Sequence, residues 1–179
     1  MLFRKGFAGQ KDAIRTLFAD TFTASEGAAE GALIGDLVRD LMATTPADDL
    51  RLWSVHEGDA LLGAVIFSRL LYPEDARTVF ILSPVAVKTA HQGKGIGHAL
   101  ITHGLDDLRG AGVDYATTYG DPAYYVRVGF HPIDEDFAKA PLTLSMPQGW
   151  LGQPLSGGAG QPLIGPSRCV PALNRPELW

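Results

Sequence analysis

Three closely spaced glycines, Gly93, Gly95 and Gly97, stand between an apolar, strand-like run and an amphipathic helical pattern. The first amide groups of a helix have no acceptor within the helix, and the helix dipole makes that end positive. Glycines also let the backbone come close to a ligand. The arrangement predicts that main-chain N–H groups bind an anion such as a phosphate group.

Two common phosphate-binding motifs do not fit this turn. A dinucleotide-binding fingerprint that starts at Gly93 requires another glycine at position 98, which is occupied by His98. A P-loop requires a glycine at position 88, which is occupied by Lys88. These mismatches disfavour other nucleotide binders and leave the pattern Gln92-x-x-Gly95-x-Gly97.

A second polar group, Gly120-Asp121-Pro122-Ala123-Tyr124-Tyr125, follows a later strand-like run. Aspartate is a good N-cap, and proline fits the first position of a helix. We therefore predict a short helix over Pro122 to Arg127. The hydroxyl group of a tyrosine on this helix could donate a hydrogen bond or a proton.

Together these motifs resemble the GNAT superfamily of N-acetyltransferases. The pattern Gln92-x-x-Gly95-x-Gly97 is similar to the acetyl-CoA loop of that family, and Tyr125-x-x-x-Gly129-Phe130 stands where such enzymes carry Tyr-x-x-x-Gly-Phe. The stretch from Gly120 to Tyr125 resembles a bacterial subgroup that also has a longer C-terminal segment. The likeness in element order covers residues 2 to 135, and its specific motifs lie within residues 78 to 131.

The resemblance implies an enzyme that transfers the acetyl group of acetyl-CoA to a primary amine by direct attack in a ternary complex. Acetyl-CoA is then a cosubstrate, and no metal is expected. The resemblance makes Tyr125 the catalytic acid that protonates the departing CoA thiolate, and an amide of the strand before the turn stabilises the oxyanion. The cofactor-binding residues it implies are Val85, Ala86, Val87, Gln92, Gly93, Lys94, Gly95, Ile96, Gly97 and His98.

The general base is not identified by the sequence. Members of the family often carry a glutamate on the strand before the glycines, whereas this strand offers only Ser83. Glu26, Glu30, His131 or a water chain are the other candidates. The missing carboxylate keeps open an alternative function, a non-catalytic acyl-CoA-binding or regulatory module.

The elements that position these residues follow from periodicity. Strand, turn, helix and strand between residues 78 and 119 form a βαβ unit with parallel pairing, and Pro84 predicts a splay or bulge in its first strand. The class is therefore α/β (α+β mixed), and the resemblance implies a GNAT-like acyl-CoA N-acyltransferase fold with a central mixed sheet, splayed parallel strands and flanking helices. Expected strands are 2–7, 51–56, 60–71, 78–87, 113–119 and one starting at Gly129; expected helices contain 14–22, 33–42 and 95–109, with a break at 23–27.

The chain of 179 residues is long enough for one domain with an appendage. Residues 141–179 hold seven of the 12 prolines and six of the 21 glycines. We therefore predict an N-acetyltransferase domain over residues 1–140 and a Gly/Pro-rich C-terminal extension over residues 141–179 that packs on the same domain. Within the extension, Leu142 to Met146 alternate like a strand.

Composition excludes several other classes of protein. The net charge is −5 and no Lys/Arg-rich tract occurs, which disfavours nucleic acid as a partner. The longest apolar run, Leu61 to Phe67, is too short to cross a membrane, and the N-terminus does not resemble a secretory signal, so we expect a cytoplasmic protein. Cys169 is the single cysteine, and the five histidines lack zinc-site spacing. The expected partner is a small-molecule or peptide amine acceptor, and a homodimer is left open.

Overall fold

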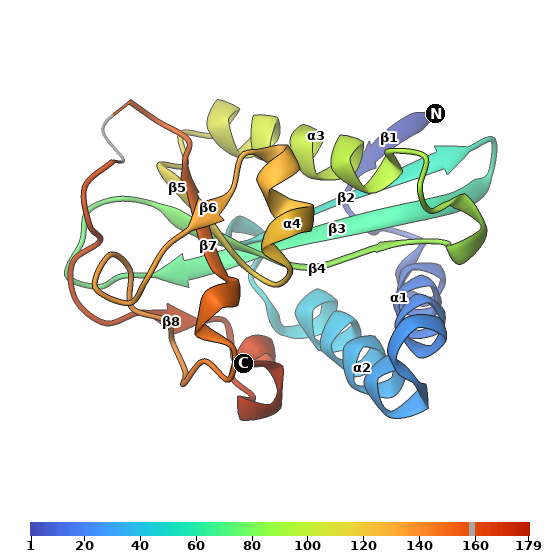
Figure 1. Ribbon diagram of the computed structural model, residues 1–179. Coiled ribbons are helices and arrows are strands. Elements are labelled where there is room, and N and C mark those ends of the chain that lie inside the picture. Colours follow the sequence, from blue (N-terminus) through green and yellow to red (C-terminus); the bar gives the residue numbers. More distant parts are fainter. Residues whose placement is uncertain (158–159) are drawn as a thin grey trace. The chain divides into compact units, whose positions relative to one another are not determined.

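The computed structural model describes residues 1–157 and 160–179, and Figure 1 shows its elements. These residues form two compact units. Unit 1 consists of Met1–Phe67 and Pro84–Gly104, and unit 2 consists of Ser68–Ser83 and Leu105–Trp179. Three elements contribute to both units: strands β3 (Ala60–Leu71) and β4 (Val79–Val87) and helix α3 (Ile96–Gly110).

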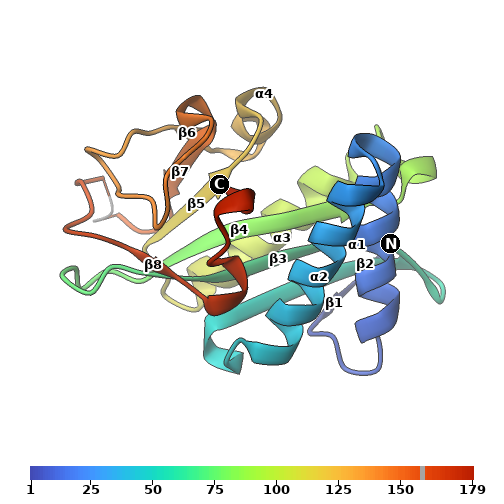
Figure 2. The same ribbon diagram turned by 90° about the horizontal axis from the view of Figure 1, so that it is seen from below.

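Unit 1 is a set of strands covered on both faces. Strands β1 (Leu2–Lys5) and β2 (Leu50–Glu57) pair antiparallel, and the strand order is β1-β2-β3-β4. Helices α1 (Lys11–Glu26) and α2 (Ala28–Thr44) lie on one side of these strands, and the first turns of α3 lie on the other (Figures 1 and 2). The predicted strands and helices of this region are confirmed, with ends shifted by a few residues.

The two helices of the pair pack with little space between them. Both bury a stripe at helical spacing, with Ile14 and Phe18 on α1 and Val38 and Leu41 on α2 among its members. Helix α1 continues to Glu26, so only Gly27, with φ of +99°, remains of the break expected over residues 23–27. A Cβ atom at Gly31 would overlap the side chain of Thr23 and the carbonyl of Ala19. The backbones therefore approach closely at this point.

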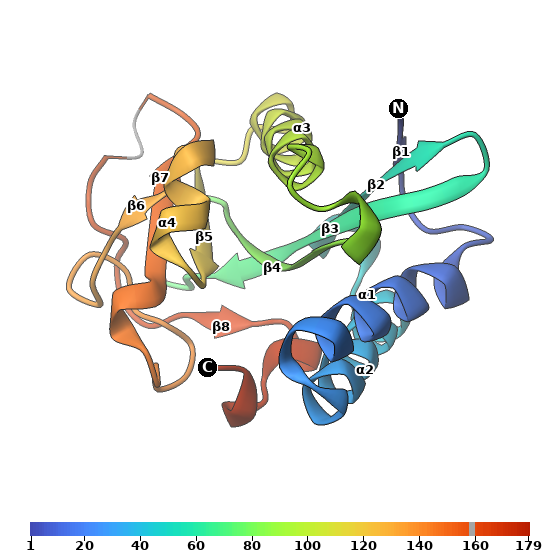
Figure 3. The ribbon, with the colours of Figure 1, turned by 45° about the vertical axis from the view of Figure 1, so that its right-hand side comes forward.

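Unit 2 contains the parallel pair that the βαβ pattern predicts. Strand β4 pairs parallel with β5 (Tyr115–Tyr119), in a register from Val79 opposite Tyr115 to Leu82 opposite Thr118. Strand β5 then pairs antiparallel with β7 (Trp150–Pro154), which also pairs with β6 (His131–Pro132). Strand β8 (Arg168–Cys169) pairs with the end of β3. Helix α4 (Pro122–Tyr125) lies beside β6 (Figure 3). Short 3₁₀ turns complete the described chain: 47–49, 89–91, 126–128, 147–149, 171–173 and 176–178.

Two strand predictions for this unit were wrong in detail. Residues Leu142 to Met146 form no strand despite their alternation, and the strand of this region is β7. A Cβ atom at Gly152 of β7 would collide with the ring of Tyr115, so the pairing of β7 with β5 requires glycine at this position. The strand expected from Gly129 begins at His131, because Gly129 has φ of +92° and caps the preceding turn.

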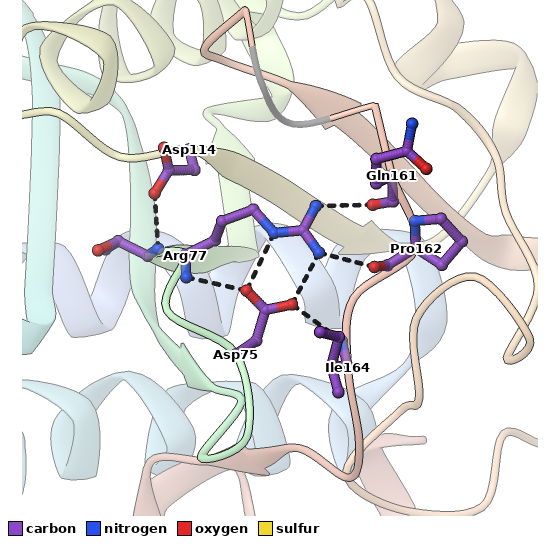
Figure 4. A network of polar contacts seen from close by, with 7 residues as sticks. Asp75, Arg77, Asp114, Gln161, Pro162 and Ile164 are labelled. Atoms are coloured by element: carbon purple, nitrogen blue, oxygen red, sulfur yellow. Dashed lines mark hydrogen bonds and ion pairs between the residues drawn. The ribbon is translucent and has the colours of Figure 1, made fainter.

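The Gly/Pro-rich segment, residues 141–179, belongs to unit 2, where both the pairing of β7 and side-chain contacts hold it. Arg77 donates from Nη1 to the carbonyl of Gln161 at 2.7 Å and from Nη2 to the carbonyl of Pro162 at 2.6 Å (Figure 4). Asp75 holds Arg77 and accepts a hydrogen bond from the amide of Ile164 at 2.9 Å. The division of the chain at residue 140 stays a prediction.

Candidate active site

The glycine turn, residues 93–97, connects the end of β4 to α3 in unit 1. Gly93 and Gly95 have φ of +74° and +77°, and a Cβ atom at either position would meet nothing within 4 Å. This left-handed conformation favours glycine, and the space beside the backbone is open. The first helical hydrogen bond runs from the amide of Ala99 to the carbonyl of Gly95 at 3.0 Å. The amides of Ile96 and Gly97 precede it, so the helix itself supplies them with no acceptor.

The chain fixes the start of this turn with its own polar groups. The carboxamide Nε2 of Gln92 donates to the carbonyl of Val87 at 3.0 Å, and the amide of Lys88 donates to the carbonyl of Leu62 at 2.8 Å. The amide of His91 donates to the carbonyl of Lys88 at 2.8 Å. Gln92 therefore ties the last residue of β4 to the glycine turn. Contacts within the chain therefore shape the backbone that precedes the amides of Ile96 and Gly97.

The electrostatic surroundings of the turn favour an anion. Lys88 and Lys94 are exposed, and neither forms an ion pair within the described parts of the chain. The N-terminus of α3 adds the positive end of its dipole. Positive charge, amides without a helical acceptor and positive-φ glycines occur together within ten residues of sequence.

The β4–β5 pairing ends close to the proline in β4. The last paired residues are Leu82 and Thr118, and the Thr118 hydroxyl donates to the carbonyl of Leu82 at 3.0 Å. Pro84 has no N–H to continue a ladder, as the sequence predicted. The next residues of β4 belong to unit 1: Val85 is half-buried, and Ala86 and Val87 are buried.

Tyr125 lies in unit 2, on α4 of the motif Gly120 to Phe130. The carboxylate of Asp121 accepts a hydrogen bond from the amide of Ala123 at 2.9 Å, which confirms the predicted N-cap. The Tyr125 ring packs against the backbone of Gly120 and lies edge-on to Phe130, with ring centroids 5.9 Å apart. Burial raises the pKa of Tyr125 to about 12, although its interaction with the Thr118 hydroxyl lowers it in part. The phenol is therefore protonated throughout the physiological range.

The candidate bases fall in both units. Glu26 and Glu30 are in unit 1, at the junction of α1 and α2, where burial and the charge of Glu26 raise the pKa of Glu30. Ser83, which is half-buried, and His131, which is exposed, are in unit 2 with Tyr125.

Two polar residues of unit 2 were not singled out from the sequence. Thr118 caps the Leu82 carbonyl, as described above, and Tyr119 follows it at the end of β5. The Tyr119 hydroxyl accepts a hydrogen bond from the amide of Met146 at 2.6 Å, and its ring stacks on Trp179 with centroids 6.0 Å apart. Their position directly before Gly120 was the signal available in the sequence.

Within residues 1–157 and 160–179, no group of three or more histidine, cysteine, aspartate or glutamate side chains is arranged to hold a metal ion. No helix in the same residues is long and apolar enough to cross a membrane. The chemistry that the described groups can perform is anion binding by main-chain amides in unit 1 and hydrogen-bond donation by a phenol in unit 2.

A mixed sheet with a parallel β4–β5 pair, a glycine turn at the start of α3 and a tyrosine on the helix after β5 define an acyltransferase class of fold. The family model described as "Acetyltransferase (GNAT) family" matches residues 11–130, and the chain belongs to this family. The predicted family, fold class and enzyme class, an N-acetyltransferase, are confirmed.

Relatives and solved structures agree with this assignment. The chain is 34% identical to the uncharacterized N-acetyltransferase YjhQ of Escherichia coli K12 over 128 residues. These aligned residues cover 68% of each chain. A crystal structure of the GNAT N-acetyltransferase YhbS from Escherichia coli, in complex with CoA, is similar with a TM-score of 0.76 and 24% identity, over 97% of this chain and 92% of that one. A GNAT acetyltransferase from Brucella melitensis in complex with acetyl-CoA gives a TM-score of 0.71 and 27% identity, over 97% of both chains.

Proposed function

We propose that this protein binds acetyl-CoA and transfers its acetyl group to a primary amine on a small molecule or peptide, by direct attack in a ternary complex. The observation that carries the proposal is the glycine turn, with its positive-φ glycines and the amides of Ile96 and Gly97 ahead of the first helical hydrogen bond. The similar proteins crystallised with CoA and acetyl-CoA support the choice of cofactor. A cytoplasmic location and a homodimer stay predictions.

In this proposal the cofactor is bound mainly by main chain. The amides from Gly93 to His98 bind the pyrophosphate, and Lys94 adds positive charge. The backbone of Val85 to Val87 pairs with the pantetheine arm as a further strand would. An amide of the same stretch donates to the oxyanion of the tetrahedral intermediate, an interaction typically worth about 3 kcal/mol.

The reaction itself needs a deprotonated amine. A lysine-like ammonium has a pKa of about 10.4, so a base must remove a proton before or during attack. The amine nitrogen then forms a C–N bond with the thioester carbonyl, and the C–S bond breaks to release the CoA thiolate. We assign the base to Glu30, because its raised pKa makes it a stronger base than an ordinary exposed glutamate.

Tyr125 is proposed to stabilise the leaving group, the CoA thiolate. Its pKa of about 12 exceeds the value of about 8.5 that is typical of a thiol, so complete proton transfer to the thiolate is uphill. A hydrogen bond from the phenol stabilises the developing negative charge on sulfur without that cost.

Calorimetric titration with acetyl-CoA tests the cofactor assignment. We expect saturable binding, and no binding at millimolar ligand contradicts the proposal. Release of CoA thiol over a panel of amines then tests catalysis. The alternative function, a non-catalytic acyl-CoA-binding module, is favoured by the absence of a carboxylate from β4, and it predicts binding without thiol release for every amine.

A further inference from the structure

Thr118 is a buried threonine at the point where the pairing of β4 and β5 ends. It is 0% exposed, and it lies opposite Leu82, the last β4 residue in the parallel register. Its hydroxyl group donates to the Leu82 carbonyl at 3.0 Å. This bond fixes the direction of the hydroxyl hydrogen, because turning it elsewhere removes a partner from the carbonyl.

The same hydroxyl group also forms a hydrogen bond with the phenol of Tyr125. A threonine hydroxyl has one hydrogen and two lone pairs. Because that hydrogen is donated to the Leu82 carbonyl, Thr118 is the acceptor toward the phenol, and the phenol is the donor. A chain of hydrogen bonds therefore runs from the Tyr125 hydroxyl through Thr118 Oγ1 to the Leu82 carbonyl. All three residues belong to unit 2.

The other contacts described for Tyr125 involve its ring. A Cβ atom at Gly120 would lie 2.8 Å from the ring carbon Cε2. The rings of Tyr124 and Phe130 lie edge-on to it, with centroids 5.0 Å and 5.9 Å away. Such contacts fix the plane of the ring, whereas the O–H group can still rotate about the C–O bond. Thr118 supplies the polar partner that sets this rotation.

The Thr118 hydroxyl has a second orientation available. Its hydrogen bond lowers the pKa of Tyr125, against the larger effect of burial. A hydroxyl group lowers the pKa of a phenol by donating a hydrogen bond to the charged form. Thr118 does so when its hydrogen turns from the Leu82 carbonyl to the phenolic oxygen. The residue is then an acceptor for the neutral phenol and a donor to a phenol that carries more negative charge.

We propose that Thr118 is a positioning residue, which directs the hydroxyl of Tyr125 for the departing CoA thiolate. As negative charge develops on the sulfur, the phenolic hydrogen turns from Thr118 to the sulfur. The hydrogen of Thr118 turns at the same time from the Leu82 carbonyl to the phenolic oxygen. Two hydroxyl groups rotate, and no covalent bond changes in this step. The inference rests on the proposed function, because it uses the role of Tyr125 toward the leaving group.

The test is a double-mutant cycle on kcat for release of CoA thiol, measured with the amine that reacts fastest with the wild-type protein. Thr118→Val keeps the side-chain shape and removes the hydroxyl, so we expect kcat to fall about tenfold while acetyl-CoA affinity changes little. In the Tyr125→Phe background the same substitution should change kcat less than about twofold, because the phenol is gone. An equal fall in both backgrounds would mean a merely structural role and would overturn the inference.

Thr117→Val is the matched control. Thr117 precedes Thr118 and is equally buried, and its hydroxyl oxygen has no hydrogen-bond partner among the described residues. Its loss should leave kcat within about twofold of the wild-type value. Thr118→Ser keeps the hydroxyl and should keep most of the activity, whereas Thr118→Ala, which lacks one oxygen atom relative to serine, should not. This second pair decides the question if thermal melting shows that Thr118→Val is unfolded.

An NMR measurement tests the hydrogen bond without any amine. In protein whose tyrosines carry ¹³C at Cζ, the resonance of Tyr125 is assigned by its absence from Tyr125→Phe. It should shift in Thr118→Val and stay in place in Thr117→Val, and no shift in either would overturn the inference. An unchanged kcat in Tyr125→Phe, or no thiol release with any amine, would remove the proposed function and this inference together. A kcat that falls in Tyr125→Phe but not in Thr118→Val would remove this inference alone.

Discussion

The glycine turn in unit 1 presents main-chain groups, whereas the tyrosine motif in unit 2, residues 120–130, presents a side chain. The glycine turn is exposed from Gly93 to Gly95 and offers main-chain amides, so its anion binding depends on the backbone angles at Gly93 and Gly95. The tyrosine motif presents one phenol whose pKa burial has moved to about 12. Anion binding at the glycine turn therefore depends on backbone conformation at single residues. The proton affinity of Tyr125 depends on the groups that surround its side chain.

The same contrast extends to how each unit holds its backbone. In unit 1, helices and strands supply most partners for main-chain groups. In unit 2, the Gly/Pro-rich segment adds side-chain contacts to the pairing of β7, such as those of the Asp75–Arg77 pair and of the Trp179 indole, which donates to the carbonyl of Leu173 at 2.9 Å. Side-chain substitutions should therefore cost more in unit 2, and backbone substitutions should matter more for function in unit 1.

The largest expected effect is on the stability of unit 2. The Asp75 side chain is only 4% exposed and forms an ion pair with Arg77 at 2.7 Å. Asp75→Asn leaves the guanidinium without its carboxylate, and we expect a loss of about 3 kcal/mol in the free energy of unfolding, measured by urea denaturation. The control Asp106→Asn breaks an exposed pair with Arg109 and should cost less than about 0.5 kcal/mol. Equal losses would contradict the distinction between the units.

The contribution of Asp75 also depends on pH. The hydrogen bond from Arg77 holds the pKa of Asp75 well below its usual range. A carboxylate with a depressed folded-state pKa stabilises the protein above its unfolded value of about 3.9, and this stabilisation is lost as the pH falls further. The stability difference between wild type and Asp75→Asn should therefore be constant near neutrality and shrink below pH 4. A difference that grows on acidification would contradict this assignment.

Tyr125→Phe tests the side-chain site. The substitution keeps the ring that packs against Gly120 and removes the hydroxyl, so we expect kcat to fall about a hundredfold while acetyl-CoA affinity changes little. Tyr124→Phe in the same motif is the control and should change kcat by less than about threefold. An unchanged kcat for Tyr125→Phe would remove its role toward the leaving group.

Gly95→Val tests the main-chain site. A valine at φ of +77° is strained by about 1–2 kcal/mol, and relief of that strain moves the amides away from the anion. We expect acetyl-CoA to bind about tenfold more weakly by calorimetry. Gly112→Val places the same residue at φ of +80°, also with open space around it, and should reduce stability without reducing affinity. Equal affinities for both variants would show that the turn does not bind the cofactor.

The smallest expected effect concerns the proposed base. The charge of Glu26 helps to raise the pKa of Glu30, so Glu26→Gln should move the rising limb of the kcat/KM pH profile to lower pH. Asp48→Asn, which removes an exposed carboxylate elsewhere in unit 1, is the charge control. A limb that does not move, or that moves equally in both variants, would argue against Glu30.

Local features of the sequence predicted the elements and the glycine turn because they depend on residues close together in the chain. The strand β7 was missed because Gly152 looks like a loop residue until Tyr115 is known to lie against it. The raised pKa of Tyr125 depends on its burial in the fold, and the hydrogen bond from Thr118 to the Leu82 carbonyl joins two strands. Neither can be predicted from residues that are neighbours in the sequence. The proline and glycine content of residues 141–179 did not predict the contacts of this segment with side chains such as Arg77 and Asp75, because those residues lie far away in the sequence.

The close approach of α1 and α2 at Gly31 has a consequence for motion. Where a backbone meets Ala19 and Thr23 with no side chain between, neither helix can open without breaking contacts of the other. The amide hydrogens of the two helices should therefore exchange with solvent at a common rate, as one cooperative opening unit, rather than fraying helix by helix.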